Sequence, residues 1–243
     1  INKSCIMNSY FKNRKILEDG NVYSKSMEHD ACGVGLIAST EGKKSRRIVE
    51  YGISALKAVF HRGAVDADGK TGDGAGIHLE IPYDFFAEKI EITGHKHDGS
   101  EICVGMIFMP RNNYEAQESS RTLVESELTK SNFSIYGWRQ VPVNPKVLGE
   151  KANLTRPEIT QVLFKHNDKN LTGKELERRL YESRRKIENN AIKNQIEGFY
   201  ISSLSSKSII YKGMFLAESI ADFYVDLKDE KFISRFVIFH QRF

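Results

Sequence analysis

The chain contains 243 residues, of which 40% are hydrophobic and 28% are charged, and this composition is ordinary for a folded globular protein. Its 36 basic and 32 acidic residues leave a formal charge of +4, an excess too small to indicate a nucleic-acid partner. No stretch approaches the roughly 18 consecutive apolar residues of a membrane-spanning helix, so we expect no membrane partner either.

Residues 1–31 are polar and of mixed charge, without a sustained hydrophobic period, and are predicted to form a leader. They contain no hydrophobic signal core, which argues against secretion. The three cysteines, Cys5, Cys32 and Cys103, are odd in number and lack the spacing of zinc ligands. A reducing, cytoplasmic location is therefore expected.

The elements that follow can be predicted in chain order. Residues 32–38 (CGVGLIA) are apolar and small and predict a buried strand. Apolar residues at helical spacing predict a helix over 48–60, with Ser45 as its cap and Gly63 at its end. The stretch 63–76, rich in glycine and aspartate, predicts a long ordered turn. Further strands are predicted at 77–81, 102–109, 133–141, 159–164, 199–204, 208–211 and 235–243, and further helices at 83–91, 112–130 and 174–193.

The order of these elements indicates the fold class. Strands and helices are mixed, and at least two pairs of neighbouring strands have connections short enough for hairpins. This favours an α+β fold with largely antiparallel sheet over strict alternation of strand and helix. In the helix predicted at 174–193, arginines are interleaved with glutamates, which predicts a solvated charged face.

Cys32 is the first residue that could carry chemistry. A cysteine in a buried strand is usually inert packing, but Gly33 and Gly35 leave room for another group to approach the backbone. The preceding residues 27–31 are polar and predict exposed chain. Cleavage before Cys32 would give it a free α-amine, which titrates near pH ~8 and can take the proton of the thiol, whose pKa is ~8.5. Cys32 would then supply its own general base.

His61, Arg62 and Gly63 form the second candidate, together with the loop behind them. Their local sequence also fits a helix end with a basic last turn. The functional interpretation is a loop shaped around a small substrate that Arg62 holds. A nucleotide-binding loop is disfavoured, because 72–76 (GDGAG) carries an acid and has no following Lys-Ser/Thr.

The third candidate lies in residues 239–243 (FHQRF). Strand alternation would place His240 and Arg242 on one side, and an arginine at a strand end can bind a carboxylate through two hydrogen bonds. A plain surface position is the alternative. His95 and His97 lie in a loop with few other ligands, so no metal site is expected there.

Taken together, three segments resemble one family. In order and spacing, 27–38 (MEHDACGVGLIA), 61–77 (HRGAVDADGKTGDGAGI) and 239–243 (FHQRF) are similar to the N-terminal class II glutamine amidotransferase domain of glutamate synthase large chains. The similarity runs from about residue 23 to the end. Agreement is also found at 104–108, 136–139, 141–142, 147–150, 178–180 and 199–200.

This resemblance implies an N-terminal-nucleophile hydrolase fold, a four-layer αββα sandwich in which two antiparallel sheets lie between helical layers. It implies that the leader 1–31 is removed and that 32–243 is the amidotransferase domain, incomplete at its C-terminal side. In that family, the freed cysteine attacks the side-chain amide of L-glutamine and forms a thioester, and the resemblance implies the same reaction here. Ammonia leaves and travels to 2-oxoglutarate, where reduction yields glutamate in ammonia assimilation.

Residue roles follow from the same resemblance. Cys32 matches the nucleophile, Arg62 the arginine that shapes the pocket, and Arg242 the arginine that binds the α-carboxylate of glutamine. Supporting positions are Gly33, His61, Gly63 and His240. The family's oxyanion-hole residues and the acid that holds the α-amine fall beyond residue 243. We therefore expect a fragment cut at both ends and nearly inactive alone, since one lost oxyanion-hole donor costs about two to three powers of ten in rate.

The resemblance implies no cofactor in these residues. FMN, an iron–sulfur cluster and NAD(P)H or ferredoxin are implied only for the whole enzyme, with the remaining synthase domains of the same chain and a small electron-transfer subunit as partners. Three alternatives stay open: a non-catalytic domain of the same fold that keeps its leader, another class II amidotransferase, and a nucleotide-binding module.

Overall fold

The chain divides by its internal contacts into two units, 1–31 and 32–243. In the first unit residues 12–19 are helical, while the segment 27–31, predicted as exposed chain, lies outside the described residues. The structure, a computed structural model, describes residues 12–20, 24 and 32–242. All elements named below belong to the second unit.

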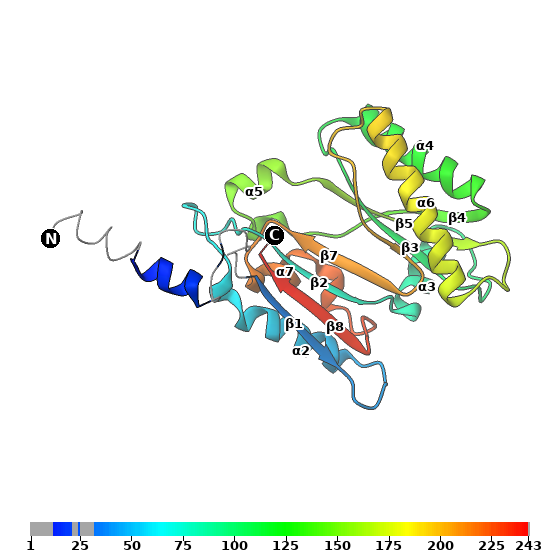
Figure 1. The fold of residues 1–243 in the computed structure, drawn as a ribbon. Helices are drawn as coiled ribbons and strands as arrows, with labels where there is room; N and C mark the ends of the chain where they lie inside the picture. Colours follow the sequence, from blue (N-terminus) through cyan, green and yellow to red (C-terminus); the bar gives the residue numbers. More distant parts are fainter. Residues whose placement is uncertain (1–11, 21–23, 25–31, 243) are drawn as a thin grey trace. The chain divides into compact units, whose positions relative to one another are not determined.

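The first sheet of this unit has four antiparallel strands in the order β1, β8, β2, β7 (Figure 1). Their bounds are Gly33–Ala38 for β1, Phe236–Gln241 for β8, Ala75–Glu80 for β2 and Ser208–Gly213 for β7. The segments 32–38 and 239–243, far apart in the sequence, are thus brought together, because β8 pairs with β1.

The second sheet is also antiparallel, in the order β4, β5, β3, β6. These strands span Phe133–Gln140, Glu158–His166, Cys103–Met109 and Tyr200–Ser205. Central β3 is buried along almost its whole length, as its continuous apolar sequence predicts. Two antiparallel sheets with helices confirm the predicted α+β class.

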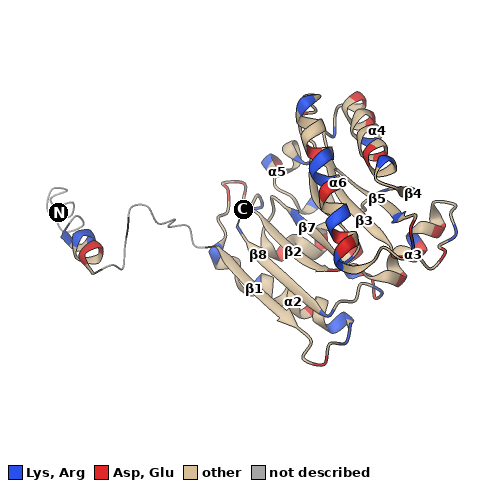
Figure 2. Cartoon of the chain, turned by 45° about the vertical axis from the view of Figure 1, so that its right-hand side comes forward, with Lys and Arg blue, Asp and Glu red and all other residues tan. Residues whose placement is uncertain are grey.

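Two long helices cover one face of the second sheet, α4 (Tyr114–Lys130) and α6 (Gly173–Lys193) (Figure 1). The outward face of α6 carries charges of both signs (Figure 2). Arg178, for example, donates to Glu175 at 3.0 Å, one of several pairs at helical spacing. The predicted solvated face is therefore confirmed, and each such exposed pair contributes only about 0.3–0.5 kcal/mol.

One helix, α2 (Arg46–Ala58), packs on the first sheet through a glycine. A Cβ on Gly52 would lie 2.5 Å from Cγ1 of Val237 on β8, so only glycine allows this approach. The remaining helical elements are α3 (Tyr83–Ile92), α5 (Glu150–Thr155), α7 (Ile220–Phe223), and the short turns η1 (Phe60–Arg62), η2 (Pro145–Val147), η3 (Ala217–Ser219) and η4 (Val225–Lys228).

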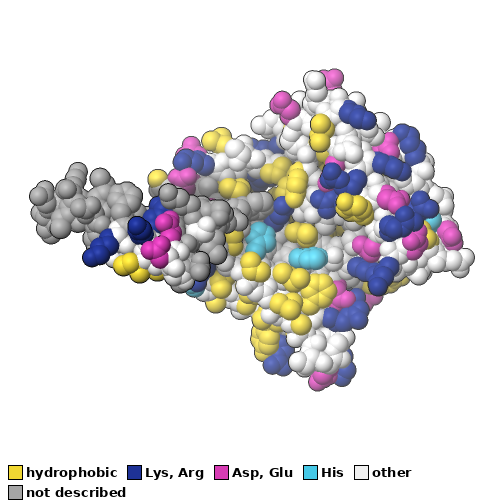
Figure 3. Space-filling view, viewed as in Figure 1, with side chains coloured by type: hydrophobic (Ala, Val, Ile, Leu, Met, Phe, Trp, Pro, Cys, Tyr) yellow, Lys and Arg dark blue, Asp and Glu magenta, His cyan; other side chains and the backbone are white. Residues whose placement is uncertain are grey.

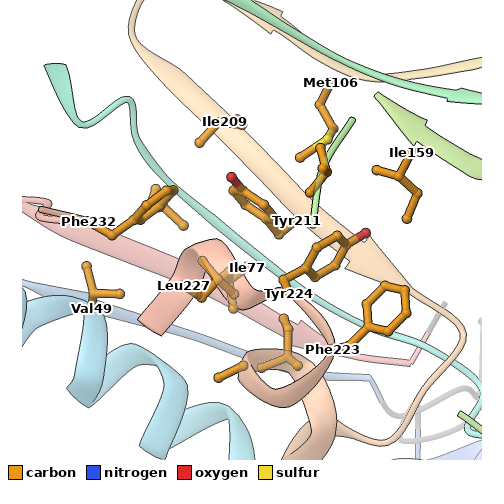
Figure 4. Close-up of a cluster of buried hydrophobic side chains, with 14 of the residues drawn as sticks. Val49, Ile77, Met106, Ile159, Ile209, Tyr211, Phe223, Tyr224, Leu227 and Phe232 are labelled. Carbon is orange, nitrogen blue, oxygen red and sulfur yellow. The ribbon is translucent and has the colours of Figure 1, made fainter. Parts of the chain in front are cut away.

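The main core joins side chains of both sheets with α2, α3 and α7. Figure 4 shows its aromatic centre, where Tyr211 of β7 meets Tyr224 edge to face with ring centroids 4.9 Å apart. Phe232 lies on the other side of Tyr211 at 5.6 Å. The two tyrosines and the phenylalanine are fully buried, and each such side chain contributes roughly 1.5–3 kcal/mol by burial.

A buried ion pair lies beside this core. Arg139 of β4 donates two hydrogen bonds to the carboxylate of Asp226 in η4, at 2.8 and 2.9 Å. Tyr211 also donates to Asp226 at 3.1 Å. Burial alone would lower the pKa of Arg139, but hydrogen bonding and the charge of Asp226 raise that pKa above its usual value.

The other face of the first sheet is open. Val34 and Leu36 on β1 are 68% and 61% exposed, and Ile238 on β8 is 39% exposed. Hydrophobic side chains gather over these two strands in Figure 3. The prediction of a buried strand at 32–38 is therefore wrong for one face of β1, where Val34 and Leu36 remain largely exposed.

Two predicted ends are also corrected. The α-helix does not run to Gly63 but ends at Ala58, and the 3-10 turn η1 follows. Gly63 has φ −91° and ψ 151°, an extended conformation rather than that of a helix-ending glycine. The last strand ends at Gln241 instead of continuing to 243, because Arg242 has φ 87°. Ser45 does precede the helix, but its side chain makes no cap hydrogen bond.

Candidate active site

Cys32 lies directly before β1 and is exposed, whereas Cys103 on β3 is fully buried. Burial raises the pKa of the Cys103 thiol well above its usual value, and the charges of Glu101 and Glu177 add to the rise. A protonated, buried thiol is inert. Cys32 is thus the accessible thiol of the second unit.

The pairing of β1 with β8 places Cys32 next to residues 240–242, the HQR motif. Gly33 is the partner of Gln241 in this antiparallel pair. Cys32 therefore stands one residue before the last paired position, and Arg242 stands one residue after it on the neighbouring strand. Two motifs about two hundred residues apart in the sequence end side by side.

Arg62 reaches the same place from η1. A Cβ on Gly33 would lie 3.2 Å from Cβ of Arg62 and 3.3 Å from its Cγ. The stem of Arg62 therefore runs against the backbone next to Cys32, and the missing side chain at Gly33 allows this contact. The neighbouring His61 ring meets Phe60 edge to face, with centroids 6.1 Å apart. The structure thus brings Cys32, Gly33 and Arg62 together.

Gly63 is a second close contact between the motifs. A Cβ there would lie 2.1 Å from Nε2 of Gln241 and 3.3 Å from Oδ1 of Asp73. The Gln241 side chain is 1% exposed and occupies the space beside Gly63. The HRG motif (residues 61–63) and the HQR motif therefore pack closely against each other, and a larger residue at 63 would displace the buried side chain of Gln241.

Arg242 is held by its backbone and by its side chain. Its N–H donates to the carbonyl of Gly74 at 2.8 Å, and its Nε lies 3.3 Å from Oδ2 of Asp73. His240 donates from Nδ1 to the carbonyl oxygen of Arg242 at 3.1 Å, because a carbonyl can only accept. A Cβ on Gly76 would lie 2.7 Å from Nε2 of His240, so glycine at 76 makes room for the ring.

The loop between Gly63 and β2 is folded by its own side chains. Asp68 accepts hydrogen bonds from the backbone and hydroxyl of Thr71 at 2.7 and 2.6 Å, which hold the pKa of its carboxyl far below the usual value. Asp66 pairs with Lys151 of α5 at 2.8 Å. The predicted ordered turn is thus confirmed, and it is anchored on a helix that the sequence pattern did not reveal.

Sequence reasoning missed two residues of this site, Asp73 and Gln241. Both carry a buried oxygen, Oδ1 of Asp73 and Oε1 of Gln241, that has no hydrogen-bond partner among the described residues. The signal for Asp73 was a single acid between glycines in the GDG triplet. Gln241 gave a weaker signal, a polar residue inside an apolar strand.

The described residues, 12–20, 24 and 32–242, contain neither a group of metal ligands nor a helix that could span a membrane. Within these ranges no three His, Cys, Asp or Glu side chains stand together as a metal site. His97, in the loop considered above, bonds instead to the hydroxyl of Tyr83 at 2.9 Å. The helices of these ranges are all too short or too polar to span a bilayer.

Comparison with known proteins gives a family match over residues 32–243, to the model described as glutamine amidotransferases class-II. The chain is 53% identical over 231 residues to the glutamate synthase [NADPH] large chain of Azospirillum brasilense. The aligned region covers 95% of this chain and 15% of that protein. It is 39% identical over 217 residues to ferredoxin-dependent glutamate synthase 2 of Synechocystis, 89% of this chain and 14% of that protein. The chain therefore spans about 15% of the length of these relatives.

Proposed function

Because the chain belongs to the class II glutamine amidotransferases, we propose that residues 32–243 release ammonia from L-glutamine with Cys32 as the nucleophile. One observation carries the assignment of the site. The exposed Cys32 stands at the end of the first sheet, next to the stem of Arg62 and to the residue pair Gly33–Gln241 that leads to Arg242.

In this proposal the leader 1–31 is removed, and Cys32 acquires a free α-amine. The amine takes the thiol proton, and the sulfur attacks the side-chain carbonyl carbon of glutamine. The proton leaves with the amide nitrogen as ammonia, and a γ-glutamyl thioester remains on Cys32. Water then cleaves the thioester, which gives glutamate and restores the thiol.

The two arginines have different tasks. Arg242 binds the α-carboxylate of glutamine, because a guanidinium presents parallel N–H donors that match a carboxylate. Arg62 lies along the backbone at Gly33 and shapes the wall beside the sulfur. Gly33 permits the contact of Arg62, and Gly63 leaves space for the side chain of Gln241. His61 and His240 are supporting residues that orient their neighbours.

We propose the four-layer αββα sandwich as the architecture of the complete domain. Its support is the pair of antiparallel sheets, with α2 on one and α4 and α6 on the other. The domain itself contains 32–243, and 1–31 is the leader. The division of internal contacts between Ala31 and Cys32 is consistent with this boundary.

For the longer protein we propose a glutamate synthase, in which the ammonia reacts with 2-oxoglutarate in another domain. The relatives named for NADPH and for ferredoxin support this. The residues here do not fit an iron–sulfur cluster, since three scattered cysteines cannot supply four ligands. FMN, the cluster and the NAD(P)H or ferredoxin site belong to the remaining domains or to a small electron-transfer subunit. A cytoplasmic location suits the free thiol of Cys32.

Glutamine hydrolysis by the full-length protein tests this function. The variant Cys32→Ala removes the nucleophile, and we expect glutamate release from glutamine to fall to background. Cys103→Ala is the matched control, because its thiol is buried and inert, and it should keep glutamine turnover within about twofold of the wild type. Turnover that survives in Cys32→Ala would contradict the proposal.

A further inference from the structure

Asp73 links the two arginine-bearing motifs. Its backbone N–H donates to the carbonyl of Ala64, directly after the HRG triplet, at 3.3 Å. Its Oδ1 lies 3.3 Å from the position that a Cβ on Gly63 would take, and its Oδ2 lies 3.3 Å from Nε of Arg242. The next residue, Gly74, accepts the backbone hydrogen bond of Arg242. One short segment therefore holds both motifs.

Arg242 needs such a hold, because its backbone is strained. A φ of 87° is rare for a residue with a side chain and is unfavourable for its backbone. Such a conformation persists only where its surroundings fix it. Three contacts do so here: the N–H to Gly74, the carbonyl to His240, and the guanidinium to Asp73. The strained backbone turns the side chain out of the strand and toward the loop.

The other acids of the loop have different tasks. Asp68 closes its own turn through Thr71, and Asp66 anchors the loop to Lys151. Of these three aspartates, Asp73 is the one that contacts Arg242. The carboxylate of Asp73 is also not fully hydrogen-bonded, since its Oδ1 is buried without a partner among the described residues. A buried unsatisfied oxygen costs stability, and such local costs are typical of functional sites.

We propose that Asp73 is a positioning residue that fixes the guanidinium of Arg242 for the α-carboxylate of glutamine. This inference rests on the function proposed above for Arg242. The pair is partly exposed, with 25% of the Asp73 side chain and 35% of the Arg242 side chain accessible, so the guanidinium remains within reach of a ligand. The contact through Nε uses one of the five N–H donors of arginine, and a bidentate carboxylate uses two others.

The test measures glutamine kinetics in the full-length protein with the variant Asp73→Asn. This change keeps the shape of the side chain and removes its charge, so Arg242 is held less firmly. We expect the KM for glutamine to rise about fivefold, because a charged partner is replaced by a neutral one, while kcat changes by less than about twofold. Asp222→Asn is the control, which removes a charge from a half-exposed surface pair with Lys228 and should leave KM unchanged.

A double-mutant cycle with Arg242→Lys tests whether Asp73 acts through Arg242. Arg242→Lys alone should raise KM, and adding Asp73→Asn should then cost much less than fivefold. If Arg242→Lys raises KM but Asp73→Asn leaves it unchanged, this inference is overturned and the function of the site stands. If Arg242→Lys leaves KM unchanged, the carboxylate role of Arg242 is wrong, and this inference falls with it. A loss of kcat together with a lowered melting temperature in Asp73→Asn would assign Asp73 a structural role and overturn the inference.

Discussion

Single residues decide how closely the segments around Cys32 approach each other. Gly33 and Gly63 have extended or ordinary backbone angles, so glycine is needed there for space and not for conformation. At Gly33 the added Cβ would stand 3.2 Å from Arg62, a distance that a small shift can relieve. At Gly63 it would stand 2.1 Å from Nε2 of Gln241, a buried side chain that would have to shift within its packed surroundings.

This difference predicts unequal effects of alanine at the two glycines. Gly63→Ala should destabilise the domain by about 1–3 kcal/mol, the usual cost of overpacking, whereas Gly33→Ala should cost less. The free energy of unfolding in urea measures both. Equal costs for the two variants would mean that the Gln241 side chain yields more easily than its burial indicates.

At the residue scale the sequence pointed to candidate reactive groups but not to the residues that contact them. Cys32, Arg62 and Arg242 belong to motifs that can be recognised by residue type. Asp73 could not be identified, because its proposed role depends on a contact with Arg242. The two residues are 169 positions apart in the sequence, and only strand pairing brings them together. The exposure of Val34 and Leu36 was missed for a similar reason, since small apolar residues predict burial regardless of what covers them.

At the scale of elements, α2 depends on its glycine for contact with the first sheet. Alanine is normally better than glycine in a helix by about 1 kcal/mol. At Gly52 the added Cβ would lie 2.5 Å from Val237, and we expect overpacking to outweigh that gain. Gly52→Ala should therefore lower the free energy of unfolding by about 1–2 kcal/mol.

Ser54→Ala is the control for this prediction, because Ser54 is exposed on the same helix and alanine there should be neutral or slightly stabilising. A cycle with Val237→Ala adds a second check, since removing the opposing side chain should reduce the cost of Gly52→Ala. A stabilised Gly52→Ala variant would show that α2 can move away from the sheet.

Long elements with a regular period were predicted well, and short ones were not. The strand Cys103–Met109 and the helix Gly173–Lys193 follow their apolar patterns closely. Glu150–Thr155 and Ile220–Phe223 were missed, because six and four residues are too few to establish a helical period. The early end of the last strand depends on the contacts of Arg242, which no local pattern contains.

At the scale of the whole molecule, the pair of Arg139 and Asp226 is a buried connection between the second sheet and the chain that leads back to the first. Asp226→Asn would leave the Arg139 charge without its partner, and we expect a loss of about 3–5 kcal/mol in the free energy of unfolding. Asp222→Asn is the control, because its pair with Lys228 is half exposed and should cost about 1 kcal/mol or less.

The contrast between these two aspartates is measured by urea unfolding of both variants. A similar small cost for each would show that water reaches Arg139 when its partner is lost. Two further facts concern the whole molecule. Hydrophobic side chains of β1 and β8 are exposed on the first sheet, and the chain represents about 15% of the length of its relatives. They make the full-length protein the proper material for every kinetic test proposed here.

The most direct test of the central claim is the intact mass of the full-length protein after reaction with 6-diazo-5-oxo-norleucine, an electrophilic analogue of glutamine. We expect a single adduct on a chain that begins at Cys32, because leader cleavage, the nucleophile and the glutamine site must all be as proposed for that product to form. A chain that keeps residues 1–31 and leaves Cys32 unmodified would contradict it and favour a non-catalytic domain of the same family.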